Sequence, residues 1–131
     1  MSSSDAGSGA TEFKAWIDDE LASRGAFTAL VVLVEISERS VTLQVFTCLN
    51  VTVAETDWPD VVALFDSTGV SWDGASFFPV SVDGGPLDDA AARIGLRAIE
   101  QRVRAERLAL NEGFFFARDG QRIMVEEAGP N

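Results

Sequence analysis

The sequence contains no histidine, no tyrosine and only one cysteine among its 131 residues. Without histidine, the chain cannot build Ser-His-Asp or Cys-His catalytic arrangements, imidazole metal ligands or imidazole acid-base catalysis. The single cysteine, Cys48, excludes internal disulfides and thiolate metal sites, and its place in a strand-forming run predicts a small buried hydrophobic side chain. We therefore expect no metal site, and a reducing cytoplasm fits this cysteine content.

Long hydrophobic runs and phosphate-binding glycine motifs are also missing. No apolar run approaches the roughly 20 residues that a membrane-spanning helix needs. Residues 1–10 have neither the basic nor the apolar part of a secretion signal. Gly84-Gly85 precedes a predicted helix but lacks the spacing and the Lys-Ser/Thr pair of a nucleotide-binding loop. We expect a cytoplasmic protein that is not exported, binds no membrane and holds no cofactor.

Positive charge is scarce, because 10 basic residues face 21 acidic ones and the net charge is −11 at pH 7. Such a chain repels nucleic acids and anionic membranes, so we expect no binding to either by direct charge attraction. Two interpretations of the acidity stay open. It keeps the protein soluble, for example in a salt-rich environment, or it meets a basic protein partner.

Length and a hydrophobic content of 47% predict a single globular domain with an ordinary core. Residues 1–10 are rich in serine and glycine and predict a disordered tail, and residues 128–131 predict a flexible end. The domain is therefore expected to span residues 11–127.

The segment from Ala26 to Glu55 predicts a meander of three antiparallel strands around which the domain is organised. Its first run is apolar at both odd and even positions, which is typical of a central strand covered on both faces. The second run alternates and predicts a half-buried strand, and a shorter third strand holds Val51 and Val53. The predicted buried residues of this sheet are Leu30, Val32, Val34, Leu43 and Val45.

Three helices are predicted around the meander. The first begins at a Thr11 cap and ends at Gly25, and the second begins at Asp57-Trp58-Pro59 and ends at Gly69. The third and longest runs from about Pro86 to Leu110.

One or two edge strands are expected between Val70 and Val82, with Pro79 at a sheet edge. A closing hairpin runs from Phe114 to Val125 around a two-residue Asp119-Gly120 loop, which pairs Phe116 with Ile123. The order α-βββ-α-β(β)-α-ββ, with antiparallel strands and helices grouped on one face, is α+β. In its front half, the order of helix, three-stranded meander and second helix resembles the architecture of small acidic secretion chaperones.

The long helix carries half of the basic residues of the chain. Arg93, Arg97, Arg104 and Arg107 fall with Glu100 in one sector of about 80°. One interpretation is a solvated face whose arginines pair with Glu100 and neighbouring acids. The functional interpretation is a stripe that docks an acidic partner or the acidic surface of a second copy.

The apolar surface of this helix extends over two sides and is wider than packing against one sheet needs. We therefore expect a homodimer with Leu96, Ile99 and Val103 at the contact, flanked by the arginine stripe. In the intramolecular alternative the closing hairpin covers the same side, with Phe114, Phe116, Ile123 and Val125.

Three functions stay open. The first is a non-enzymatic acidic protein that binds a protein partner by charge complementarity, as an inhibitor, an immunity-type protein or a secretion-chaperone-like protein. The second is a carboxylate-based enzyme or small-ligand binder, for which Asp57 with Asp60, or Asp73 with Asp83, are the candidate pairs. The third is a mimic of nucleic-acid charge that blocks a DNA-binding protein. The first requires no catalytic residues and is the function that the sequence favours.

Overall fold

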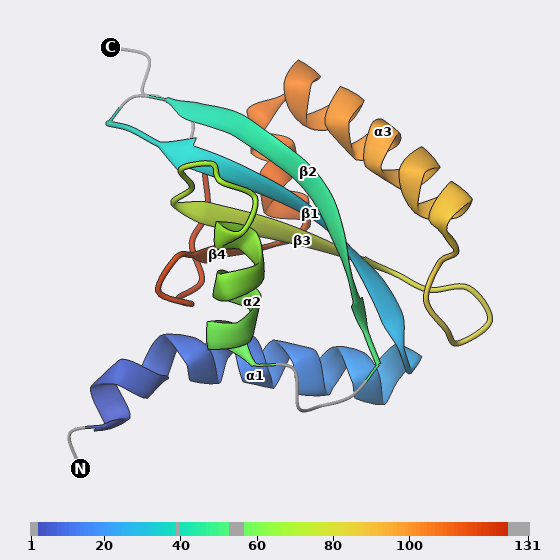
Figure 1. Cartoon of the computed structure of the whole chain (residues 1–131), viewed down its shortest axis with the longest axis horizontal. Helices are drawn as coiled ribbons and strands as arrows, with labels where there is room; N and C mark the ends of the chain where they lie inside the picture. The colour runs from blue at the N-terminus through green and yellow to red at the C-terminus, as the bar shows by residue number, and fades with distance from the viewer. Residues whose placement is uncertain (1–2, 39, 53–56, 126–131) are drawn as a thin grey trace.

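The part of the chain that the structure describes folds into four strands, three α-helices and one 3-10 helix (Figure 1). The computed structural model describes residues 3–38, 40–52 and 57–125, and of residues 3–11 the backbone alone. The strands form one antiparallel sheet in the order β2-β1-β3-β4, which confirms the predicted α+β class. In chain order the elements are α1 (Ser3–Arg24), β1 (Phe27–Ile36), β2 (Val41–Val51), α2 (Trp58–Asp66), β3 (Gly74–Val80), α3 (Asp89–Ala105), η1 (Arg107–Glu112) and β4 (Phe114–Ala117).

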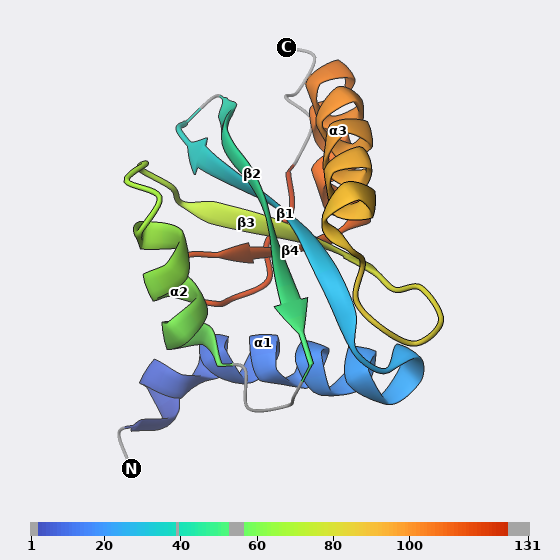
Figure 2. The ribbon, with the colours of Figure 1, turned by 45° about the vertical axis from the view of Figure 1, so that its right-hand side comes forward.

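Helices cover both faces of the sheet, not one face as the sequence predicts. In Figure 2 the strands lie between α1 and α2 on one side and α3 on the other. The core therefore has two layers, one on each face of the sheet, and the odd and even residues of β1 point into different layers. The first layer is rich in aromatic rings and includes Phe13, Trp16, Trp58, Phe65, Phe77 and Phe116, and the second contains Val32, Val34, Val103, Ala109, Leu110 and Phe115.

β1 is the central strand that its sequence predicts. All residues from Phe27 to Val34 are buried, since β2 and β3 flank the strand and helices cover both of its faces. Leu30, Val32 and Val34 are buried as expected, whereas Leu43 and Val45 are only partly buried. The difference follows from topology, because β2 pairs on one side only.

A β-bulge in β2 overturns the predicted alternation of that strand. Leu33 pairs with Val45 while Val34 pairs with Leu43, so Gln44 is an extra residue on β2. The bulge places Leu43 in the α3 layer and Val45 in the α1 layer, although the sequence predicts one face for both. The Gln44 amide donates to Glu35 Oε1 at 3.0 Å, which holds the extra residue on its neighbour strand.

The predicted third strand of the meander is wrong as far as the structure describes it. β2 continues through Asn50 to Val51, which pairs with Phe27. Asn50 does not break the strand, because its side-chain oxygen accepts a 2.7 Å hydrogen bond from the Thr28 hydroxyl across the ladder. Val53 lies outside the described residues. Among the described residues of the front half, two strands lie between α1 and α2, whereas the resemblance to secretion chaperones expects three.

The first helix is longer than predicted. α1 begins at Ser3, eight residues before the expected cap at Thr11, and the disordered tail at residues 1–10 stays a prediction. Once packing of the segment around Trp16 holds a helix, each upstream residue adds a hydrogen bond at little nucleation cost. Residues 126–131 lie outside the described part, and the flexible end at 128–131 stays a prediction.

The second helix confirms its predicted start. The Asp57 carboxylate accepts from the Asp60 amide at 3.2 Å, and Pro59 occupies the first turn of α2, where a missing N–H costs nothing.

The third helix ends five residues earlier than predicted. α3 is capped by Asp88, whose side chain accepts from the Ala91 amide, and stops at Ala105 because Glu106 is extended. Arg107 stabilises this break, since its guanidinium donates to the carbonyls of Val103 (2.6 Å) and Val41 (3.0 Å). The rest of the predicted helix is η1.

A single strand, β3, fills the interval in which one or two edge strands were expected. It lies inside the sheet, between β1 and β4. β4 pairs with residues 74–77 alone, so Pro79 is bonded on the β1 side only and its missing N–H is tolerated.

The closing hairpin is one residue out of its predicted register. Phe116 pairs with Arg122 and not with Ile123, and the Ala117 amide donates to the Gln121 carbonyl, which makes the loop one residue longer. Gly120 at φ +92° permits this turn. The shift turns Ile123 to the α3 face, where it packs with Phe115.

Candidate functional site

The two edges of the sheet differ in how the chain treats them. Along β4, the returning segment bonds to the outer edge through the Ala117 amide to Gln121 and through the Ile123 amide to Phe115. Along β2, no described residue pairs with the outer edge. An unpaired strand edge presents a row of free N–H and C=O groups to any extended chain that reaches it.

β2 also lacks the usual protection of an open edge. The strand is 11 residues long and its sequence VTLQVFTCLNV holds no charge, no proline and no glycine. The bulge at Gln44 is the one protective feature, and it leaves residues 45–51 as an uninterrupted strand. Edge strands of this length and composition readily accept a further strand.

Cys48 is exposed, which corrects the predicted buried side chain. The pairing explains why. Cys48 lies opposite Leu30, which is on the face of β1 that α3 covers, but the edge position leaves the cysteine open to solvent. Its exposure makes it a chemical probe of the β2 edge, and nothing marks it as a nucleophile.

One arginine of the predicted stripe, Arg104, lies against this edge strand. The Arg104 guanidinium sits 5.6 Å from the ring centre of Phe46 on β2 and donates to Glu100 at 2.9 Å. Arg93 and Arg97 share the side of Arg104 by helical phase, and both are exposed. Among the side chains that the structure describes, those of residues 12–38, 40–52 and 57–125, no carboxylate lies within ion-pair distance of either.

We define the edge surface as the outer edge of β2 from Val45 to Val51 together with Arg93, Arg97 and Arg104. Arg107, predicted as part of the stripe, is drawn inward to the two backbone carbonyls that end α3. The structure therefore places Arg104 against the strand and keeps Arg93 and Arg97 exposed on the same flank of α3. The strand edge itself is a site that the sequence does not identify, although the long uncharged run of β2 is its signal.

The predicted apolar contact residues lie against the sheet of their own chain. Val103 is fully buried, and Leu96 and Ile99 are partly buried. Ile123 and Val125 pack in the same layer as Val103, as the intramolecular alternative expects, while Phe114 and Phe116 lie in the opposite layer. Val103 has no exposed surface for a second copy, and a role for Leu96 and Ile99 at a dimer contact stays a prediction.

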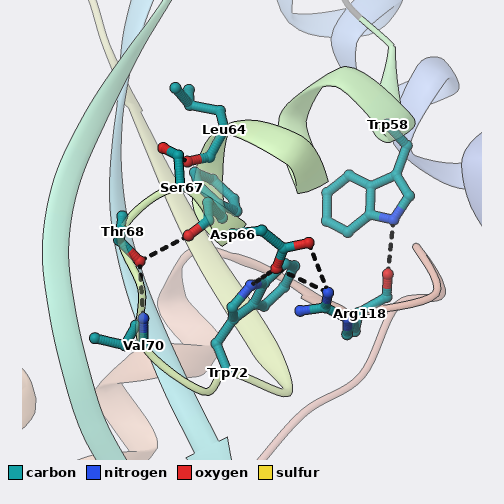
Figure 3. A network of polar contacts seen from close by, with 9 residues as sticks. Trp58, Leu64, Asp66, Ser67, Thr68, Val70, Trp72 and Arg118 are labelled. Atoms are coloured by element: carbon teal, nitrogen blue, oxygen red, sulfur yellow. Dashed lines mark hydrogen bonds and ion pairs between the residues drawn. The ribbon is translucent and has the colours of Figure 1, made fainter.

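A second polar cluster joins α2 to the closing hairpin (Figure 3). Asp66 accepts from the Trp72 indole at 2.9 Å and from Arg118 at 2.8 Å, and Arg118 also stacks 4.7 Å from the Trp72 ring centre. The Trp58 indole donates to the Arg118 carbonyl at 2.9 Å. The hydrogen bond from Arg118, followed by that from Trp72, lowers the pKa of Asp66. Each polar group here is satisfied within the cluster, which is the property of a structural clamp.

The candidate carboxylate pairs do not form a catalytic arrangement. Asp57 caps α2, and its charge, more than their hydrogen bond, raises the pKa of the neighbouring Asp60, but both side chains are exposed. Asp73 and Asp83 lie beyond opposite ends of β3, a strand of seven residues that spans about 20 Å from end to end.

Sites for small ligands are shallow on the described part of the chain. One open depression lies where α3 meets η1, lined by Ala98, Arg102, Ala105 and Ala109 among others. The described residues contain no group of three or more Cys, Asp or Glu side chains placed to hold a metal ion. They also contain no helix with the length and hydropathy to cross a membrane.

The chain matches no family model, no curated protein and no solved structure. Its function therefore has to be argued from the edge surface.

Proposed function

We propose that this chain is a non-enzymatic, cytoplasmic protein-binding module that docks a protein partner on the edge surface. The observation that carries the proposal is the outer edge of β2, which no described residue pairs, next to a helix flank with the exposed cations Arg93 and Arg97 in a protein of net charge −11. Arginine is enriched at protein contacts because its planar guanidinium binds carboxylates with two parallel hydrogen bonds. Inhibitors, immunity-type proteins and chaperones of secreted proteins all act in this way, by binding alone.

Charge acts at two ranges in this proposal. As a partner approaches to within about the Debye length of 8–10 Å, it meets the net negative charge of the whole chain, which favours a partner that is basic overall. At contact, the local cations of α3 favour carboxylates on the partner. The partner that satisfies both is a neutral or basic protein with a short acidic segment.

The alternatives have less support. A carboxylate enzyme requires a desolvated acid in a concave pocket, whereas the described carboxylates of Asp57 and Asp60 cap an exposed helix end. A mimic of nucleic-acid charge requires phosphate-like spacing of carboxylates on one face, and the face beside β2 carries arginines instead.

The test compares capture of cell proteins by three immobilised chains. These are the native sequence, Arg93→Gln with Arg97→Gln, and Lys14→Gln with Arg24→Gln. The last is a matched control, because it removes the same charge from exposed pairs on α1, on the other side of the sheet. We expect one protein to be retained in stoichiometric amount by the native chain and the control and lost from the Arg93/Arg97 variant. Equal capture by all three would contradict the proposal.

A further inference from the structure

The open edge of β2 is built to accept an extended chain. Backbone N–H and C=O groups of a strand need partners, and along β2 the described residues supply them on the β1 side only. The same molecule covers its other edge with the segment that follows β4. Among the described residues, one edge is thus closed by the chain and the other is unpaired.

We propose that the partner adds a fifth, extended strand to the outer edge of β2, and that carboxylates at alternate positions of this strand bind Arg93 and Arg97. This proposal rests on the proposed function and deepens it, because it names the bound element as an acidic extended segment. Strand addition gives affinity through the backbone and specificity through every second side chain.

The length of β2 and the position of its bulge define how much of the edge an added strand can use. The bulge at Gln44 interrupts the ladder, so the usable edge runs from Val45 to Val51. At the rise of a β-strand this edge is about 23 Å long, enough for a partner segment of about seven residues. The absence of charge along β2 means that the added backbone meets no desolvated ion at this edge.

Side-chain alternation places the carboxylates. Phe46 packs in the α3 layer, and residues two positions apart share a face, so Cys48 and Asn50 also point to the α3 side. Every second side chain of an added strand would stand on this side, next to the flank of α3 that carries the arginines. The contact between the Arg104 guanidinium and the Phe46 ring shows that an arginine on this flank of α3 is long enough to reach side chains of β2.

Charge argues against a second copy as the occupant. Antiparallel pairing of two β2 edges across a two-fold axis keeps both α3 helices on the same face of the joined sheet. The arginine flank of each α3 points toward its own β2, so the two flanks would face each other and repel. An acidic strand from a different protein meets the same flank with the opposite charge.

The test uses the full chain and three synthetic peptides of about nine residues with blocked ends. The first alternates threonine and glutamate, the second alternates threonine and lysine, and the third is the glutamate peptide with two central threonines replaced by proline. Proline keeps the charge and removes backbone donors, so it prevents strand addition. Binding is measured by fluorescence anisotropy of labelled peptide and, independently, by protection of the Cys48 thiol from alkylation.

We expect the glutamate peptide to bind and to slow alkylation of Cys48, and the proline peptide to bind at least about tenfold more weakly through lost ladder hydrogen bonds. Arg93→Gln with Arg97→Gln should weaken the glutamate peptide about three- to tenfold, while Lys14→Gln with Arg24→Gln should not. The lysine peptide should not bind at the edge.

The outcomes separate the two proposals. Equal binding of the proline and glutamate peptides, both sensitive to Arg93 and Arg97, would overturn strand addition and leave charge docking intact. No binding of either acidic peptide would overturn both. Sedimentation equilibrium of the chain without peptide tests whether a second copy occupies the edge. A dimer that is lost in the Phe46→Lys variant would assign the edge to a second copy and overturn the acidic-segment proposal.

Discussion

The guanidinium carbon of Arg104 lies 5.6 Å from the ring centre of Phe46, so an arginine of α3 rests on a side chain of the open edge strand. This contact aligns the positive flank of α3 with β2. It also brings together two features that are far apart in the sequence, an uncharged strand and a row of arginines. The edge surface exists because α3 packs across the sheet at this position.

Removal of Arg104 should leave the fold intact. The side chain is exposed, and its ion pair with Glu100 and its contact with Phe46 each contribute about 1 kcal/mol or less at an exposed site. We therefore expect Arg104→Gln to lower the free energy of unfolding by no more than about 2 kcal/mol in urea denaturation. A loss of several kcal/mol would show that α3 depends on this residue for its position.

Val32→Asp should prevent folding. Val32 is fully buried in the centre of the sheet, and an unpaired carboxylate there costs several kcal/mol, comparable to the whole stability of a domain, about 5–15 kcal/mol. The control is Thr42→Asp, an exposed position on β2. Circular dichroism should show an unfolded Val32 variant and a folded control. A Val32 variant with an unchanged thermal midpoint would contradict the position of β1 in the sheet.

Gly113→Ala should destabilise the junction between η1 and β4. A Cβ atom at Gly113 would lie 2.7 Å from the Phe77 carbonyl oxygen, a backbone atom that cannot move aside without disturbing β3. The expected loss is about 1–3 kcal/mol. At Gly85 the nearest atom would be 3.8 Å away, so Gly85→Ala is the matched control and should change the midpoint of urea denaturation little. Equal effects of the two would contradict the packing at Gly113.

Cys48 should react in the native state. Because its side chain is exposed, a maleimide or aromatic disulfide reagent should label one thiol per chain without denaturant. Mass spectrometry measures the stoichiometry, and the same reaction in urea gives the unfolded reference rate. Labelling that requires urea would return Cys48 to the buried position that the sequence predicts.

Acid should weaken the clamp around Asp66. Hydrogen bonds from Arg118 and Trp72 lower the pKa of Asp66 in the folded state below its ordinary value of 3.8. The ionised Asp66 carboxylate therefore stabilises the folded chain fully at pH values above its pKa in the unfolded chain. This stabilisation is lost as the pH falls through its lower pKa in the folded chain.

Thermal midpoints at pH 7 and at pH values below 3.8 measure this effect. Asp66→Asn should lose less stability on acidification than the native chain, whereas Asp19→Asn, an exposed position on α1, should follow the native chain. An identical acid response of the native chain and Asp66→Asn would contradict the clamp.

The parts of the fold that follow from local chemistry were predictable. The apolar residues on both faces of β1 indicated a central strand, and Asp57 with Pro59 marked the start of α2. The phase of Arg93, Arg97 and Arg104 on α3 also followed from helical geometry alone. These features depend on neighbours within a few residues.

The errors fall where tertiary contacts decide. The bulge at Gln44 and the longer loop at Gly120 each change the register by one residue. Because side chains alternate between the two faces of a sheet, a change of one residue moves each side chain to the opposite face. Arg107 left the stripe because it binds the Val41 carbonyl, far away in the sequence. Cys48 is exposed because strand order makes β2 an edge, and strand order is not a local property.

Amide hydrogen exchange of the chain, with and without the peptide of alternating threonine and glutamate, tests the edge surface most directly. In the free chain, the β2 amides that bond to β1 should already be slow, and those on the outer edge should be fast. The account predicts that the peptide slows the outer amides between Val45 and Val51 in an alternating pattern and leaves the amides of α1 unchanged. Bound peptide with no change in exchange between Val45 and Val51 would contradict it.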